Sequence, residues 1–196
     1  IVTLGNKDDS YTSTSTGVDT VVATAGANTI STGTGNDIIT GGTGADNIIG
    51  GGGDDTMQFT TGNLTSADTL TGGAGTDTVS LTTDGSTVVD ADFTNATSIE
   101  VLGTTGTNRM TLATIGALAD AAGLTTVNFS DTGTVDKLVV GSGFTSALTV
   151  DMDVDTASNT IDATAYTGTL TVTASTTDLD TAAHSLTGGT GTADVI

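Results

Sequence analysis

Short oxygen-bearing side chains recur at regular intervals in the first part of the chain, and their types and spacing could bind metal. There are seven of them: Asp19, Asn28, Asp37, Asp46, Asp55, Asp68 and Asp77. The first five are nine residues apart, and each follows a glycine by two residues. Such oxygens suit hard cations, and Ca²⁺ takes about six to eight of them at a flexible radius, whereas Mg²⁺ prefers a compact octahedron and retains water. The pattern therefore predicts calcium sites.

The spacing also predicts how the acceptors pair. Nine residues are too few to circle a core, so two repeats should form one coil, and each acceptor should lie beside the one 18 residues away. Two separations are 22 residues instead, which is 18 plus a four-residue insertion within 58–67. About five calcium sites between coils follow: Asp19 with Asp37, Asn28 with Asp46, Asp37 with Asp55, Asp46 with Asp68, and Asp55 with Asp77.

The residues around the acceptors are expected to position them. Glycines permit positive-φ turns and leave backbone carbonyl oxygens free to point at an ion. An apolar residue two places after each acceptor enters a strand and points into a thin core. In the alternative, a metal-free solenoid, Asp and Asn only cap turns, but turn chemistry does not require seven acceptors in phase. The expected carbonyl ligands are those of Gly33, Gly35, Gly42, Gly44, Gly51, Gly53, Gly73 and Gly75.

The sequence resembles the RTX family of calcium-binding nonapeptide-repeat proteins, whose consensus is GGxGxDxUx with U a large apolar residue. Residues 41–49, 50–58 and 72–80 match it position for position, and the resemblance covers 17–80. It implies a parallel β-roll with calcium between loops, secretion by a type I system, and folding in calcium-rich surroundings outside the cell. The sequence departs from the consensus at Asn28 and in the first copies, where the glycine pair is lost.

Beyond residue 80 the nonapeptide fades, but apolar alternation continues in strand-like pieces. Four apolar pairs are 22 residues apart, which predicts a longer coil: Val79 with Val101, Val88 with Met110, Val139 with Ile161, and Val150 with Val172. The alanine-rich segment 112–123 breaks the alternation and predicts a short helical insertion.

The expected fold is therefore all-β, a parallel β-helix or calcium β-roll solenoid. Residues 1–80 form the RTX calcium-binding β-roll, and 81–187 form a degenerate Thr-rich β-helix that continues the same solenoid. Residues 188–196 begin a further repeat. Because open solenoid ends are adhesive edges, we expect either a segment of a longer chain or end-to-end stacking.

Composition excludes several classes of protein. The 196 residues include 48 Thr, 28 Gly and 22 Asp, and a formal net charge of −20 argues against binding to nucleic acid. No apolar run approaches the roughly 20 residues of a transmembrane helix. With no Cys, one His and three basic residues, the chain is not expected to be an enzyme. Glu100, the single glutamate, is expected to be a surface residue.

A second acidic group lies in the later part of the chain. Asp151, Asp153 and Asp155, with Asp162 further on, are spaced like part of an EF-hand calcium loop. However, Thr156 stands where that loop requires glycine, and the flanking segments read as strands. A solvated strand face and an additional calcium site both remain open here.

The Thr-, Gly- and Asp-rich composition, together with RTX repeats and degenerate Thr-rich coils, is similar to that of bacterial S-layer proteins of the RTX type. That resemblance implies an extracellular, cell-surface structural role, with self-association into a lattice or fibre and cell-surface polysaccharide as a partner through another region. Two alternatives remain, the stalk of a type I-secreted adhesin and the secretion and folding module of an RTX exoenzyme. Ice binding is not expected, because GTGND occurs only at 33–37.

Overall fold

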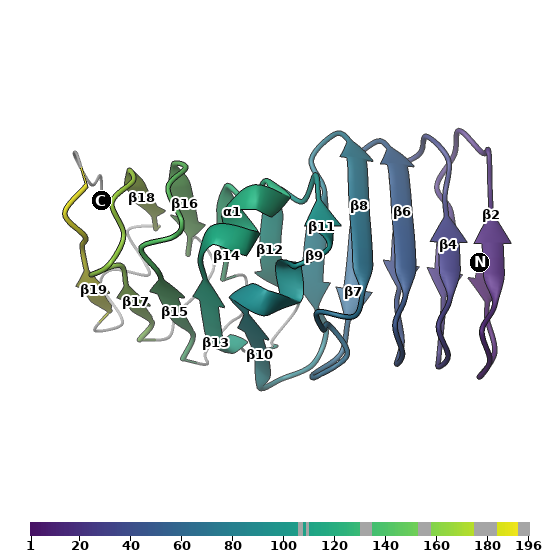
Figure 1. Cartoon of the computed structure of the whole chain (residues 1–196), viewed down its shortest axis with the longest axis horizontal. Coiled ribbons are helices and arrows are strands. Elements are labelled where there is room, and N and C mark those ends of the chain that lie inside the picture. The colour runs from purple at the N-terminus through teal and green to yellow at the C-terminus, as the bar shows by residue number, and fades with distance from the viewer. Residues whose placement is uncertain (106–107, 109, 130–134, 153–157, 175–183, 192–196) are drawn as a thin grey trace.

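The computed structural model describes residues 1–105, 108, 110–129, 135–152, 158–174 and 184–191. They form a parallel β-solenoid of about seven turns with very little helix, as the sequence predicts (Figure 1). The chain advances from β2 at one end of the long axis to β19 at the other, and one sheet continues along the whole molecule. No helix in the described ranges is long and apolar enough to cross a membrane.

Three parallel sheets form the walls of the solenoid. The first has nine strands: β1 (Val2–Thr3), β3 (Thr20–Val22), β5 (Ile38–Thr40), β7 (Thr56–Phe59), β9 (Thr78–Leu81), β12 (Val101–Thr104), β14 (Thr126–Asn128), β16 (Leu148–Asp151) and β18 (Leu170–Thr173). The second, in the N-terminal half, contains β2 (Ser10–Thr12), β4 (Thr29–Ser31), β6 (Asn47–Gly52), β8 (Thr69–Ala74) and β11 (Ala96–Thr97). The third, in the C-terminal half, contains β10 (Ser86–Val89), β13 (Met110–Ile115), β15 (Lys137–Val140), β17 (Thr160–Asp162) and β19 (Ser185–Thr187).

The strand register confirms that two nonapeptides form one coil. Val21 pairs with Ile39 and Ile39 with Met57, each a step of 18 residues, whereas Met57 pairs with Val79, a step of 22. The insertion lies in the loop between β7 and β8, as predicted. The apolar residue of each repeat points into the core, where its side chain has no exposed surface: Val21, Ile30, Ile39, Ile48 and Met57.

Coils in the C-terminal half are longer than predicted, and three expected pairs are wrong. Val79 pairs with Leu102 rather than Val101, and Ile161 pairs with Leu138 rather than Val139, so both steps are 23 residues. In both predictions the wrong one of two adjacent apolar residues was selected. A shift of one residue exchanges the inner and outer faces of a strand. The third pair fails because Met110 pairs with Ser86, and Val88 pairs with Ala113. The prediction that Val150 pairs with Val172 is confirmed.

The helical insertion is shorter than predicted. Residues 112–115 belong to β13, in which Ala113 and Ile115 are buried, and only Ala117–Ala122 forms a helix, α1. A carboxylate from the preceding coil caps α1, because Asp90 accepts hydrogen bonds from the backbone N–H groups of Gly116, Leu118 and Ala119. Asp90 begins a one-turn 3₁₀ helix, η1 (Asp90–Phe93), which packs against α1. The sequence indicated the helix by its alanines but not its start, which a distant side chain determines.

Candidate metal centre

Each acceptor of the nonapeptides directly precedes a strand, and the coil brings these residues into two rows. The first acceptor row contains Asp19, Asp37, Asp55 and Asp77, which precede the strands β3, β5, β7 and β9 of the nine-stranded sheet. The second acceptor row contains Asn28, Asp46 and Asp68, which precede β4, β6 and β8 of the facing sheet. The two rows therefore lie at opposite turns of the coil.

Backbone hydrogen bonds connect the members of each row. In the first row, the N–H groups of Asp19, Asp37 and Asp55 donate to Oδ1 of the aspartate one coil further on, at 2.6, 2.8 and 2.9 Å. In the second row, the N–H groups of Asn28 and Asp46 do the same, each at 2.9 Å. The structure thus places the members of all five predicted pairs in contact.

The second carboxylate oxygen of most row members is buried with nothing to bind. Among the members of the two acceptor rows, Oδ2 is buried without a hydrogen-bond partner in five aspartates: Asp19, Asp37, Asp46, Asp55 and Asp77. A buried carboxylate oxygen without a donor or a cation is costly, because it has lost its water. The rows therefore have the donor set that a bound cation would complete, and the residues fit calcium.

Glycines hold the backbone close to these oxygens. A side chain at Gly50 would collide with Oδ2 of Asp55 and would lie 2.8 Å from the carbonyl oxygen of Gly72 in the next coil. Both oxygens therefore border the same small space, which only glycine leaves open. Neither Gly50 nor Gly72 was among the predicted carbonyl ligands, although the doubled glycine of the repeat was the available signal.

The predicted glycine carbonyls lie along the same turns. Gly42, Gly44, Gly51, Gly53, Gly73 and Gly75 have positive φ, from 86° to 135°, whereas Gly33 and Gly35 do not. The carbonyl oxygens of Gly33 and Gly51 face the next coil, where they occupy the space that a side chain at Gly51 or Gly73 would need. The Gly33 carbonyl also accepts a hydrogen bond from the Gly52 N–H at 3.1 Å. Strands β6 and β8 thus extend into the glycine turn, which brings successive loops close together.

The last member of the second acceptor row, Asp68, has fewer free oxygens for an ion than the aspartates of the first row. Both carboxylate oxygens of Asp68 accept hydrogen bonds, Oδ1 from the Asp46 N–H and Oδ2 from the Thr65 N–H at 2.8 Å. The four-residue insertion replaces the glycine turn there, and the ring of Phe59 lies against Gly41. Asp68 therefore has no buried oxygen left over, unlike Asp55 and Asp77.

Burial and mutual repulsion change the acidity of the rows. Burial is the largest cause that raises the pKa of Asp55 to about 6; the hydrogen bond from the Asp37 N–H lowers it, and the neighbouring carboxylates of Asp77 and Asp37 add to the rise. Burial also raises the pKa of Asp46, with a smaller contribution from Asp68. The pKa of Asp77 is raised in the same way, by burial and then by Glu100 and Asp54. A cation between the coils would offset both effects.

The described residues contain no group of three or more His, Cys, Asp or Glu side chains able to hold a metal ion. Each predicted site instead has two side-chain acceptors from adjacent coils, and a bound cation would need main-chain carbonyls for its other protein ligands. This arrangement needs short repeats with glycine, since the backbone itself must reach the ion.

Sequence reasoning missed the continuation of the first row. Glu100, expected on the surface, is half-buried and precedes β12, and its Oε2 accepts a hydrogen bond from the Asp77 N–H at 2.8 Å. A further row begins at Asp136, which precedes β15 and accepts from Met110 N–H; Asn159, which precedes β17, accepts from Asp136 N–H at 2.8 Å. The missed signal was a polar acceptor directly before an apolar strand, without the glycines.

The EF-hand-like acidic group is divided by the fold. Asp151 ends β16 in the nine-stranded sheet and accepts a hydrogen bond from the Thr173 hydroxyl at 3.1 Å. Asp162 ends β17 in a different sheet and accepts from Thr164. Asp153 and Asp155 lie outside the described residues. The structure therefore does not bring Asp151 and Asp162 together as a calcium loop would.

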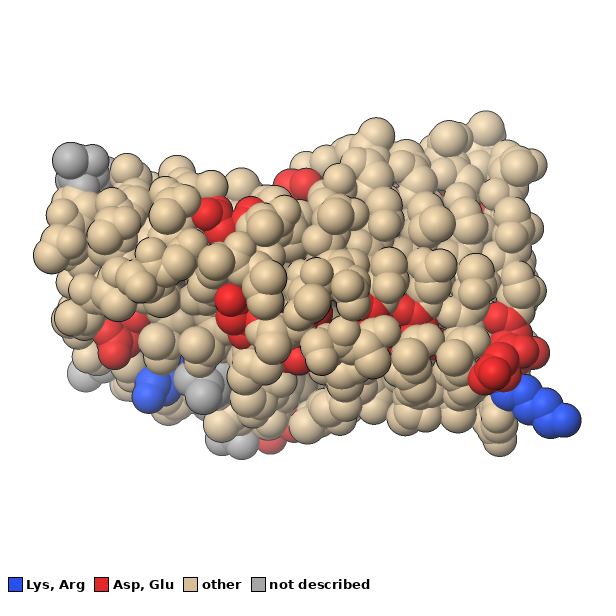
Figure 2. Space-filling view, in the orientation of Figure 1, with Lys and Arg blue, Asp and Glu red and all other residues tan. Residues whose placement is uncertain are grey.

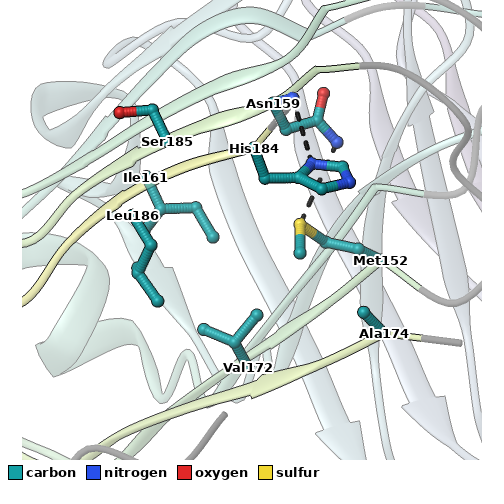
Figure 3. A pocket seen from close by; sticks show the side chains of 8 residues that line it. All are labelled: Met152, Asn159, Ile161, Val172, Ala174, His184, Ser185 and Leu186. Atoms are coloured by element: carbon teal, nitrogen blue, oxygen red, sulfur yellow. Dashed lines mark hydrogen bonds between the residues drawn. The ribbon is translucent and has the colours of Figure 1, made fainter. Parts of the chain in front are cut away.

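An apolar cavity of about 170 Å³ lies near the C-terminal end of the solenoid (Figure 3). His184, which precedes β19, lines it, and its Nδ1 accepts a hydrogen bond from the Asn159 N–H at 3.2 Å. The other lining side chains are mainly apolar, among them Met152, Ile161 and Val172. The cavity is an extension of the hydrophobic core rather than a cluster of reactive groups.

Comparison with known families agrees with the geometry of the rows. The family model described as the RTX calcium-binding nonapeptide repeat, with four copies, matches residues 13–47, 31–63 and 64–84. No match was found among curated proteins or among solved structures. The matched segment contains both acceptor rows, which are therefore similar in sequence to RTX calcium-binding nonapeptide repeats, and such repeats bind calcium.

Proposed function

We propose that calcium is a folding ligand of this chain and that the folded solenoid has a structural role, as a calcium-stabilised segment of a bacterial S-layer or surface fibre. The observation that carries the proposal is the set of five buried Oδ2 atoms without hydrogen-bond partners, four in the first acceptor row and one in the second, along the coils of one continuous solenoid. RTX repeat proteins are typically secreted and bind calcium outside the cell. We further propose that the folded chain is located at the cell surface.

The charge of the chain supports a role for calcium in folding. The formal net charge is −20, and five Ca²⁺ ions with two charges each would reduce it to −10. Self-repulsion keeps such an acidic chain expanded, so neutralisation favours the compact state. At ten to a hundred times its dissociation constant, each independent ion adds about 1.4 to 2.7 kcal/mol to stability. Several ions together would determine whether the chain is folded.

The surface supports assembly rather than catalysis. Figure 2 shows a face that is largely uncharged, with a cluster of acidic side chains at the N-terminal end and smaller acidic patches over the rest of the face. Threonine hydroxyls connect adjacent coils, as in the 2.7 Å contact between Thr61 and Thr83. A regular surface of repeated small polar side chains can pack against another copy without large rearrangement. We therefore propose self-association, and no enzymatic activity.

Two related roles use the same residues. In the stalk of a type I-secreted adhesin, calcium would stiffen a rod that does not assemble laterally. In the secretion and folding module of an RTX exoenzyme, calcium would fold the solenoid while a separate domain performs the chemistry. Cell-surface polysaccharide remains a proposed partner through another region.

Sedimentation velocity of this chain separates these proposals. It should be measured in chelator, across a calcium titration, and with magnesium as the control cation. Growth into large, chelator-reversible species supports the lattice or fibre. A compact monomer in calcium supports the stalk or the secretion module and overturns self-association. If calcium changes sedimentation no more than magnesium does, calcium is not the folding ligand.

A further inference from the structure

We propose that Asp77, the backbone carbonyl of Ser98, and Glu100 form an additional cation site of the calcium type, directly beyond the last nonapeptide repeat. The match to the repeat family ends at residue 84, and neither Ser98 nor Glu100 belongs to a repeat. The inference rests on the proposed role of calcium in the rows and extends it by one coil.

The register places Ser98 where the repeats have glycine. Ile49 pairs with Thr71 and Thr71 with Thr97, so the residues that follow them occupy equivalent places in three successive coils: Gly50, Gly72 and Ser98. Ser98 has a φ of 53°, and it is the one residue other than glycine with positive φ in the described part of the chain. Gly50 and Gly72 do not have positive φ, and in the repeats it is the next residues, Gly51 and Gly73, that do, so the positive-φ position comes one residue earlier at Ser98.

Equivalent oxygens, one from a carboxylate and one from a backbone carbonyl, converge at the Gly72 turn and at the Gly50 turn. A side chain at Gly50 would meet Oδ2 of Asp55 and the carbonyl oxygen of Gly72, whereas one at Gly72 would meet Oδ2 of Asp77 and the carbonyl oxygen of Ser98. Asp77 has no exposed surface, and its Oδ2 has no hydrogen-bond partner among the described residues. A fully buried, unpartnered carboxylate oxygen therefore points into the space that Ser98 borders.

Glu100 completes the pair as an aspartate does elsewhere in the row. Its Oε2 accepts from the Asp77 N–H at 2.8 Å, as Oδ1 of Asp77 accepts from the Asp55 N–H at 2.9 Å. The turn is shorter here, with two residue steps from Ser98 to Glu100 and five from Gly72 to Asp77. The additional methylene of glutamate lets the carboxylate reach the row from the shorter turn.

These ligands are all oxygens, two carboxylates and a carbonyl, and this set favours calcium over softer metals. Water would fill the remaining positions, because the short turn provides fewer carbonyls than a nonapeptide. The ion would neutralise the carboxylates of Asp77 and Glu100. The calcium-bound stack would thus extend from the repeats into the coil that contains β12.

The direct test is anomalous scattering from crystals of the wild-type chain grown in calcium. We expect a peak between Asp77, the Ser98 carbonyl and Glu100, in addition to a peak between Asp55 and Asp77. A peak between Asp55 and Asp77 alone overturns this inference and leaves the proposed role of calcium intact. Peaks at neither place overturn both.

Binding in solution gives an independent test. Equilibrium dialysis against calcium should show that Glu100→Gln, which keeps an oxygen for the Asp77 N–H, binds one ion at least about tenfold more weakly, because a ligand charge is lost. Asp162→Asn is the control, since it removes one carboxylate from β17, which belongs to another sheet. Circular dichroism in saturating calcium establishes that both variants are folded. Equal calcium binding by Glu100→Gln and wild type overturns the site.

Discussion

The backbone N–H of Asp55 donates a 2.9 Å hydrogen bond to Oδ1 of Asp77, 22 residues later, while Oδ2 of each carboxylate is buried without a hydrogen-bond partner in the described structure. One oxygen of each aspartate thus maintains the register of the coil, and the other faces the space between turns. The same side chain has a structural and a binding role, which explains why the acceptor recurs once in every repeat.

Neutralising Asp55 should weaken calcium-dependent folding while leaving the coil register intact. In Asp55→Asn the amide oxygen still accepts from the Asp37 N–H, but the charge that would face the ion is lost. We expect the loss of at least one ion's contribution, about 1.4 to 2.7 kcal/mol at ten to a hundred times the dissociation constant. The measurement is the calcium concentration at the midpoint of folding, followed by far-UV circular dichroism.

Asp68→Asn is the matched control for Asp55→Asn. Both oxygens of Asp68 already accept backbone hydrogen bonds, from Asp46 and Thr65, and the glycine turn is missing there. We therefore expect a smaller shift of the folding midpoint than for Asp55→Asn. An equal or larger shift would show that the last step of the second row binds calcium as strongly as the first row does.

The raised pKa of Asp55 predicts an unusual pH dependence of the calcium-free chain. Its folded-state pKa is about 6 against an ordinary value of 3.8, so the folded state holds a proton that the unfolded state releases. The contribution of this proton to stability is full below about pH 4 and is lost as the pH rises through 6. In chelator, thermal unfolding should therefore occur at a higher temperature at pH 5 than at pH 7.

Calcium should reverse that trend, since the carboxylates must lose their protons to bind it. Wild type in excess calcium is expected to be more stable at pH 7 than at pH 5. In chelator, Asp55→Asn should show a smaller difference between the two pH values than wild type does. If its pH dependence in chelator is unchanged, Asp55 does not carry the effect.

Most of the fold of the N-terminal half could be predicted because its period is strict. A glycine, an acceptor and an apolar residue recur at fixed distances, so Val21, Ile39 and Met57 had only one consistent pairing. The C-terminal half has no such marker, and adjacent apolar residues such as Leu138 and Val139 left the register open to a one-residue error.

The members of the candidate site that lie in the regular repeats could be predicted from the sequence, and those beyond the repeats could not. Spacing identified the partners Asp55 and Asp77, because a regular coil brings equivalent residues together. Spacing could not identify Glu100, since its turn is three residue steps shorter and only the backbone path shows that a longer side chain reaches the row. The capping of α1 by Asp90 was likewise unpredictable, because the contact spans 26 residues outside any repeat.

Filling the space beside Gly50 should impair calcium binding without a general loss of fold. The added methyl group of Gly50→Ala would collide with Oδ2 of Asp55 and lie 2.8 Å from the Gly72 carbonyl oxygen. Gly52→Ala is the matched control in the same strand, because its methyl group would be 3.7 Å from the nearest atom, in Thr34. Isothermal titration with calcium should show weaker binding for Gly50→Ala and near-normal binding for Gly52→Ala. Equal binding by the two variants would contradict a calcium site beside Gly50.

The inner and outer faces of β5 can be distinguished by two neighbouring isoleucines. Ile39 has no exposed surface, whereas 38% of Ile38 is exposed, and strand geometry directs them to opposite faces. Ile39→Ala should lower the free energy of unfolding in calcium by about 2 to 5 kcal/mol, the usual cost of a cavity in a packed core. Ile38→Ala should change it by less than about 1 kcal/mol, because its side chain keeps much of its contact with water. Urea unfolding in saturating calcium measures both values, and a larger loss for Ile38→Ala would show that the register of β5 against β3 and β7 is shifted by one residue.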